Sequence, residues 1–125
     1  MDGGSIKSYR DLRVWQQAMD LAALSYRLTR GFPKEELYGL TSQIRRAAAS
    51  VPANIAEERG RENRGAYVQF LRVAQGSLKE LETHLLLSVR VGLAGEEGIE
   101  PVLSQCEAVG RMLGALIRAL QARDA

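Results

Sequence analysis

The chain has 125 residues, of which 46% are hydrophobic and only 6% aromatic, and its formal net charge is +2. This length predicts a single domain, and the mild basic excess does not by itself predict a nucleic-acid partner. The lone cysteine, Cys106, excludes an internal disulfide. No apolar run approaches the ~20 residues of a membrane span. The polar start of the chain lacks the pattern of a signal peptide, so we expect a cytoplasmic protein.

The spacing of apolar residues predicts an all-α chain. Apolar positions recur every three to four residues, and no stretch alternates as a strand would. Ser8 followed by Asp11 resembles a capping box, so we expect the first helix to start near Tyr9. After a flexible tail (residues 1–8), short links would join four helices into one up-down-up-down four-helix bundle over residues 9–122. We expect the helices at about 9–30, 33–58, 66–91 and 96–121.

Two prolines fall inside the predicted helices. Pro52 lies within the apolar pattern of the second helix, where it removes a backbone donor and should bend the helix near Ala48. Pro101 is tolerated only in a first turn, so the regular part of the fourth helix should start nearer Ile99.

A polar stripe runs beside the apolar stripe of the second helix. It is either an ordinary solvated face or a partly buried polar network at a helix or subunit contact. The flanking alanines permit close approach of another backbone and favour the network, which would fix register more than it adds stability. The members of the stripe are Gln43, Arg46, Ser50, Asn54, Glu57 and Arg61.

The third helix carries a seam of heptad spacing, which suits left-handed bundle packing. Gly76 lies in its interior, where glycine costs about 1 kcal/mol relative to alanine, so we expect another helix to approach closely there. His84 is the only histidine and has no second ligand at metal spacing. The seam consists of Tyr67, Leu71, Ala74, Leu78, Leu81, Leu85 and Ser88.

Residues 59–65 contain three arginines among two glycines and an asparagine. This break is either a solvated loop or a tip that contacts phosphate, because the arginine fork matches phosphate oxygens. Short basic loops are common, which favours the solvated loop. No convergent set of catalytic or ligating groups occurs, so we expect no enzyme activity, no metal and no cofactor.

Three runs form a recognisable pattern: LTSQIRRAA at 40–48, SVPANIAE at 50–57 and FLRVAQGSLKELE at 70–82. They resemble the bacterial four-helix-bundle family of ribosomal-RNA intervening-sequence proteins. The stretches YRDLRVW at 9–15 and FPKEELYGL at 32–40 fit the same family. That family is similar to the accessory variability proteins of diversity-generating retroelements, which share the bundle, form pentameric rings, and bind nucleic acid and a reverse transcriptase.

The resemblance covers about residues 9–93 closely and the fourth helix loosely. It implies a homopentamer, no catalytic activity, and RNA or DNA binding on a basic outer surface. This chain departs from the family at Glu58, where glycine is usual, and this puts the turn geometry in question and would lengthen the second helix. The family's patterned residues, which we interpret as fold and ring determinants, are Gln43, Arg46, Ser50, Pro52, Asn54, Glu57, Gly76, Ser77 and Glu80.

The resulting hypothesis is a non-catalytic, ring-forming bundle that binds RNA or an RNA–DNA intermediate, with a reverse transcriptase as a candidate partner. The alternative is a protein-only scaffold whose arginines are ordinary solvated or interface residues. Salt-sensitive binding to phosphates would separate the two. The candidate nucleic-acid-binding residues are Arg45, Arg59, Arg61, Arg64 and Arg72.

Overall fold

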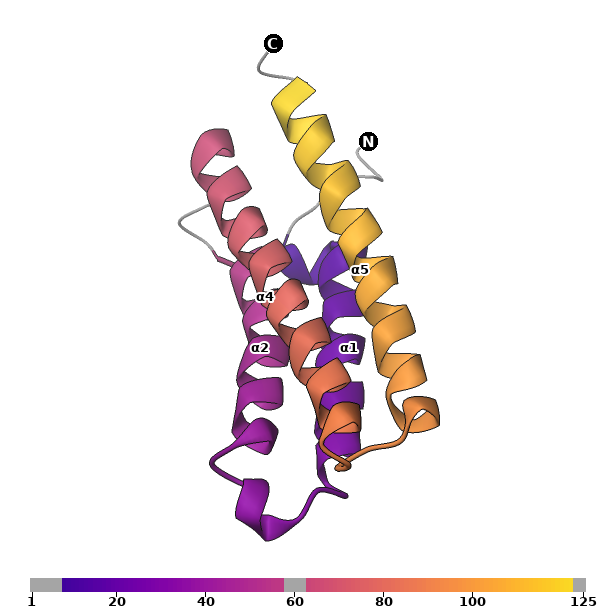
Figure 1. Ribbon diagram of the computed structural model, residues 1–125. Coiled ribbons are helices and arrows are strands. Elements are labelled where there is room, and N and C mark those ends of the chain that lie inside the picture. Colours follow the sequence, from indigo (N-terminus) through magenta and orange to yellow (C-terminus); the bar gives the residue numbers. More distant parts are fainter. Residues whose placement is uncertain (1–7, 58–62, 123–125) are drawn as a thin grey trace.

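A computed structural model describes residues 8–57 and 63–122 of the chain (Figure 1). Over these two ranges the regular structure is four long helices and two short 3₁₀ turns, without a strand. The prediction of an all-α chain with four helices is therefore confirmed for the described residues. The helices are α1 (Arg13–Thr29), α2 (Leu40–Ile55), α4 (Arg64–Arg90) and α5 (Glu96–Ala122), and the turns are η1 (Tyr9–Asp11) and η2 (Lys34–Glu36).

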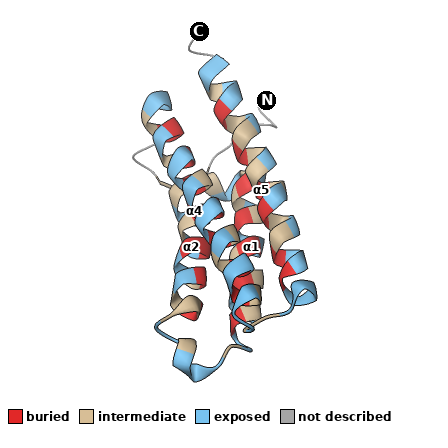
Figure 2. Ribbon diagram, in the orientation of Figure 1, coloured by how far each residue is buried: buried red, intermediate tan, exposed pale blue. Residues whose placement is uncertain are grey.

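Each helix packs against two others, so the four helices enclose one core. α2 lies between α1 and α4, and α5 lies between α4 and α1. Figure 2 shows the buried positions as stripes along the helices. Every member of the predicted α4 seam is buried, including its polar end at Ser88. Periodicity alone thus identified the side of α4 that faces the core.

The first helix begins later than predicted. The capping box does form, since Ser8 Oγ accepts a hydrogen bond from the Arg10 N–H (3.0 Å) and Asp11 Oδ2 accepts one from the Ser8 N–H (3.2 Å). However, it caps only η1, because Leu12 is extended (φ −74°, ψ 125°) and interrupts the helical path. Leu12 packs against the core. Residues 1–7 of the predicted tail lie outside the described residues, whereas Ser8, its last residue, is the N-cap of η1.

The second helix begins at Leu40 rather than at Pro33. Pro33 starts the separate turn η2, and Gly39 (φ −109°, ψ −120°) departs from helical geometry before α2. Glu36 Oε1 accepts a hydrogen bond from the Leu40 N–H (3.0 Å), so the side chain of the preceding turn caps α2. The helix ends at Ile55, before Glu58, which is not among the described residues. The bend predicted at Pro52 stays a prediction.

The later helix boundaries also differ from expectation. α4 begins at Arg64 because Asn63 Oδ1 accepts a hydrogen bond from the Ala66 N–H (2.9 Å). α5 begins at Glu96, so Pro101 lies beyond its first turn, contrary to the prediction. Pro101 and Glu97, whose carbonyl loses its helical donor, are both exposed, so water can satisfy that carbonyl. Within the described ranges, no helix has the length and apolarity that a bilayer crossing requires.

Candidate nucleic-acid interface and assembly surface

A small hydroxyl network joins α2 to α4. Ser77 Oγ donates to Ser50 Oγ (2.8 Å), and Asn54 Nδ2 donates to the Ser50 carbonyl (2.8 Å) and to Ser50 Oγ (3.0 Å). Ser77 is only 5% exposed, so its hydroxyl depends on this partner. The contact fixes the register of the two helices, because a shift along the helix axis would leave the buried hydroxyl unpaired.

The same network borders a polar hollow of about 240 Å³ between α2 and α4. Arg46 and Glu80 line it from opposite helices, and both are exposed. Within the described residues, neither side chain forms an ion pair within 4 Å. The structure thus brings together most of the predicted polar network, whose described members at this hollow are Gln43, Arg46, Ser50, Ser77 and Glu80.

Two predicted members lie elsewhere. Glu57 follows the end of α2. Gly76 faces a groove between α4 and α5 rather than the hollow between α2 and α4. A Cβ added at Gly76 would meet nothing within 4 Å, so the expected close approach of another helix does not occur among residues 8–57 and 63–122.

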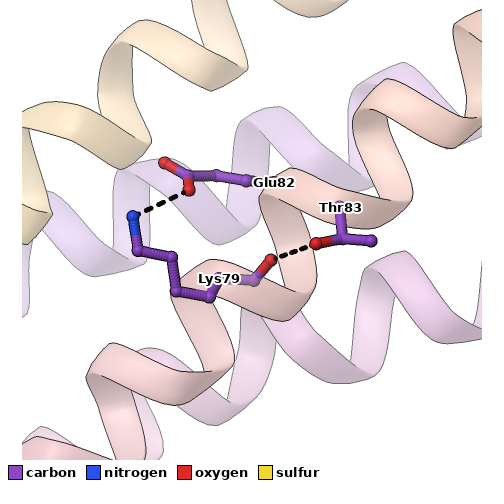
Figure 3. Close-up of polar contacts among 3 residues, drawn as sticks. All are labelled: Lys79, Glu82 and Thr83. Carbon is purple, nitrogen blue, oxygen red and sulfur yellow. Dashed lines mark hydrogen bonds and ion pairs between the residues drawn. The ribbon is translucent and has the colours of Figure 1, made fainter.

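The α4–α5 groove has a volume of about 660 Å³ and mixes charges of both signs. Lys79 Nζ lies 3.3 Å from Glu82 Oε1, and the Thr83 hydroxyl donates to the Lys79 carbonyl (2.8 Å), as Figure 3 shows. Lys79 is 82% exposed, so this ion pair adds little stability. The charged residues of the groove are Arg72, Lys79, Glu82, Glu107 and Arg111.

Cys106 also lines this groove but is buried. Burial, with a smaller contribution from the carboxylate of Glu82, raises the pKa of the Cys106 thiol to about 12. The thiol is therefore neutral at physiological pH and acts as a small apolar side chain among the buried residues of α5.

Arg45, a candidate phosphate ligand, is held in place by α1. Its Nε donates to Thr29 Oγ1 (2.8 Å), and its guanidinium carbon lies 4.7 Å from the centroid of the Tyr26 ring. Thr29 is buried, and its hydroxyl donates in turn to the carbonyl of Ser25 (3.0 Å). The Arg45 guanidinium is therefore positioned by a cation–π contact and a hydrogen bond.

Around Arg45 lie two adjoining hollows, of about 390 and 280 Å³, which share Leu37, Thr41 and Arg45. We call this surface the α1–α2 corner. Its aromatic and cationic members are Tyr26, Arg30, Phe32, Lys34, Tyr38, Arg45 and Arg46.

The sequence pattern did not predict most of this surface. Helical spacing from Leu12, Trp15, Met19 and Ala22 would place Tyr26 on an apolar stripe, but Tyr26 is 41% exposed. Tyr38 stands at the break between η2 and α2 and is 92% exposed. The available signal was an aromatic residue beside Gly39, the glycine that precedes α2.

The predicted arginine set does not converge on one surface. Arg45 lies at the α1–α2 corner, Arg72 lies at the α4–α5 groove, and Arg64 is the first residue of α4. Arg59 and Arg61 lie outside the described residues. Each of the hollows named above contains at most one member of this set.

The histidine and the carboxylates of the described residues do not form a metal site. The Nδ1 atom of His84 is buried and has no hydrogen-bond partner in the described ranges. No group of three or more His, Cys, Asp or Glu side chains within 8–57 and 63–122 could hold a metal ion.

The sequence profile of the 23S rRNA-intervening sequence protein family matches residues 10–115, which make up most of the chain. No curated protein matches this sequence.

Proposed function

The chain belongs to the 23S rRNA-intervening sequence protein family, and we propose that it is a non-catalytic, ring-forming protein that binds RNA or RNA–DNA through exposed cationic side chains. The proposal includes an up-down-up-down bundle, a homopentamer, and a reverse transcriptase as candidate partner. The homopentamer and the reverse-transcriptase partner follow from the likeness to the accessory variability proteins of diversity-generating retroelements. The family match carries the proposal. The alternative is a protein-only scaffold.

Exposed cations support the nucleic-acid component. Arg46, Arg64 and Arg72 are all exposed, and guanidinium groups match phosphate oxygens in a bidentate manner. Such contacts release counterions from the nucleic acid, so the affinity would fall steeply with salt.

The α2–α4 surface supports the assembly component. Arg46 and Glu80 have opposite charges and share one hollow without pairing to each other. In a ring the subunit contacts are head-to-tail, so a cation from a different surface of the neighbouring subunit would pair with Glu80. Gly76, with open space above it, would accept a second backbone at the neighbouring groove.

The assembly is tested by light scattering at micromolar concentration. A ring of five would have five times the 13.8 kDa mass of the chain. A monomeric mass at that concentration would remove the ring from the proposal.

Binding is tested by titrating labelled RNA and DNA at about 50 and 200 mM salt, the range over which phosphate contacts change affinity most visibly. The titration is repeated with Arg59, Arg61 and Arg64 changed to Gln, and with Arg118→Gln as a control at an exposed position of α5. Micromolar binding that weakens with salt, and weakens further in the triple variant, supports the proposal. Absence of binding at the lower salt concentration would leave the scaffold.

A further inference from the structure

We propose that the α1–α2 corner binds single-stranded nucleic acid, with an unpaired base stacked on Tyr38 and the flanking phosphates held by Arg46, Arg30 and Lys34. This inference rests on the proposed nucleic-acid binding and gives it a surface and a form of ligand. That surface is not the one that the arginine pattern predicted.

The aromatic side chains are the first argument. Tyr38 is 92% exposed and Tyr26 is 41% exposed, whereas Trp15 and Phe32 pack against the core. Tyr38 therefore adds little to folding, and its ring is open to a ligand. Stacking of a base on such a ring contributes about 1–3 kcal/mol and tolerates any base, because every base has a π face.

The second argument is the preorganisation of Arg45. Its Nε is bound to Thr29 and its guanidinium lies over Tyr26, so the group is already ordered before any ligand arrives. Its two terminal amino groups have no hydrogen-bond partner in the described part of the chain. Binding a phosphate or a base edge would therefore cost less side-chain entropy than at a free arginine.

The third argument is charge. Arg30 and Lys34 line the smaller hollow and Arg46 the larger one, so cations flank Arg45 on both sides. Two carboxylates are close in sequence, but Glu36, which keeps its charge while it accepts a hydrogen bond from the Leu40 N–H, lines neither hollow. Glu35 is exposed on η2 and lines neither hollow. The corner is thus cationic where a strand would lie.

The shape of the corner favours a single strand over a duplex. The larger hollow, of about 390 Å³, falls in the range of roughly 300–1,000 Å³ that is typical of small-ligand sites. In a duplex the base faces are covered by their neighbours, so only an unpaired base can stack on an exposed tyrosine. The α4–α5 groove is larger but is lined by no aromatic side chain and contains two carboxylates.

The experiment is a fluorescence-anisotropy titration of the full chain with labelled oligouridine and oligothymidine, and with a blunt hairpin duplex of similar charge. Tyr38→Ala should weaken single-strand binding about tenfold, the effect of one lost stacking contact. Tyr38→Phe should restore most of the affinity, because phenylalanine keeps the ring. Leu86→Ala, at an exposed apolar position of α4, is the matched control and should bind as the unmodified chain does.

The outcomes separate this inference from the proposed function. If the unmodified chain binds none of the probes at low salt, both fail. If it binds but Tyr38→Ala binds equally well, the corner is not the site, while nucleic-acid binding stands. If Tyr38→Ala keeps its affinity and instead changes the mass measured by light scattering, the corner is a protein contact and the inference is overturned. Since Tyr38 is almost fully exposed, its substitution should leave the thermal unfolding unchanged.

Discussion

The α1–α2 corner and the α4–α5 groove both present several cations, but their surroundings differ. At the corner, Arg45 is stacked on Tyr26, and a second, fully accessible tyrosine stands beside it. In the groove, Lys79 is paired with Glu82, and Glu107 adds another carboxylate. The number of cations is therefore a poor guide to a nucleic-acid site. The residues that neutralise or orient those cations distinguish the two surfaces.

The largest expected effect comes from removing the free cations of the corner. We expect a chain with Arg30, Lys34 and Arg46 changed to Gln to lose affinity for oligouridine by ten- to a hundredfold at low salt. The slope of log K against log salt should flatten by about two units, because each single-strand phosphate contact contributes about 0.7. Anisotropy titrations at several salt concentrations measure both quantities.

The matched control removes the same charge from the groove by changing Arg72, Lys79 and Arg111 to Gln. Because Glu82 and Glu107 already offset these cations, we expect an affinity loss of less than about threefold. If the two variants lost equal affinity for oligouridine, binding would depend only on total charge. The corner and the groove would then not differ as nucleic-acid surfaces.

A second prediction concerns the thiol that lines the groove. The folded-state pKa of Cys106 is about 12, above its ordinary value of 9.0, so the protonated thiol favours the folded state. This contribution is fully present below about pH 9 and is lost as the pH rises toward 12. Between pH 8 and 10, the free energy of unfolding measured in urea should fall by about 1 kcal/mol in the unmodified chain. A Cys106→Ala variant should not show this decrease. If the free energy of unfolding changed with pH in the same way for both proteins, burial of the thiol would be contradicted.

A third prediction tests the anchoring of Arg45. Lysine lacks the planar fork and Nε, so Arg45→Lys should lose both the Thr29 hydrogen bond and stacking on Tyr26. We expect about 1 kcal/mol of destabilisation in urea unfolding. The neighbouring Arg46→Lys, at an exposed position without these contacts, should change stability by less than about 0.5 kcal/mol. Equal effects would mean that Arg45 is not anchored.

The smallest effect is expected at Gly76. Its added Cβ would meet nothing, so Gly76→Ala should stabilise the isolated chain by about 0.5–1 kcal/mol through helix propensity. Gly92 has a positive φ of 83°, so Gly92→Ala should destabilise the chain by a similar amount. Light scattering completes the test, because a variant that is more stable but assembles less would place a subunit contact at Gly76.

The sequence predicted most accurately which side of helix α4 faces the core. The spacing from Tyr67 to Ser88 identified every buried member of the α4 seam, because a period near 3.6 records which side of a helix avoids water. Helix starts were less predictable. The interruption at Leu12 and the cap that Glu36 provides to α2 depend on local geometry that spacing does not encode.

The candidate site was the least predictable part. The sequence indicated Arg45 as a candidate phosphate ligand. It did not indicate the contacts of Arg45 to Tyr26 and Thr29, because those residues lie on another helix. Tyr26 fitted an apolar stripe, and only packing reveals that the core ends before reaching it. Contacts between helices that are distant in sequence determine which cations are ordered and which aromatic rings are open, and periodicity carries no information on them.

The most direct test is photocrosslinking of the full chain to a 4-thiouridine-containing oligouridine, followed by mass spectrometry of the crosslinked peptides. If the α1–α2 corner is the binding site, crosslinks should concentrate on the peptides that carry Tyr26 and Tyr38. Unlabelled oligouridine should reduce these crosslinks by competition. Crosslinks concentrated on the α4 and α5 peptides that line the groove, around Arg72 and Arg111, would contradict it.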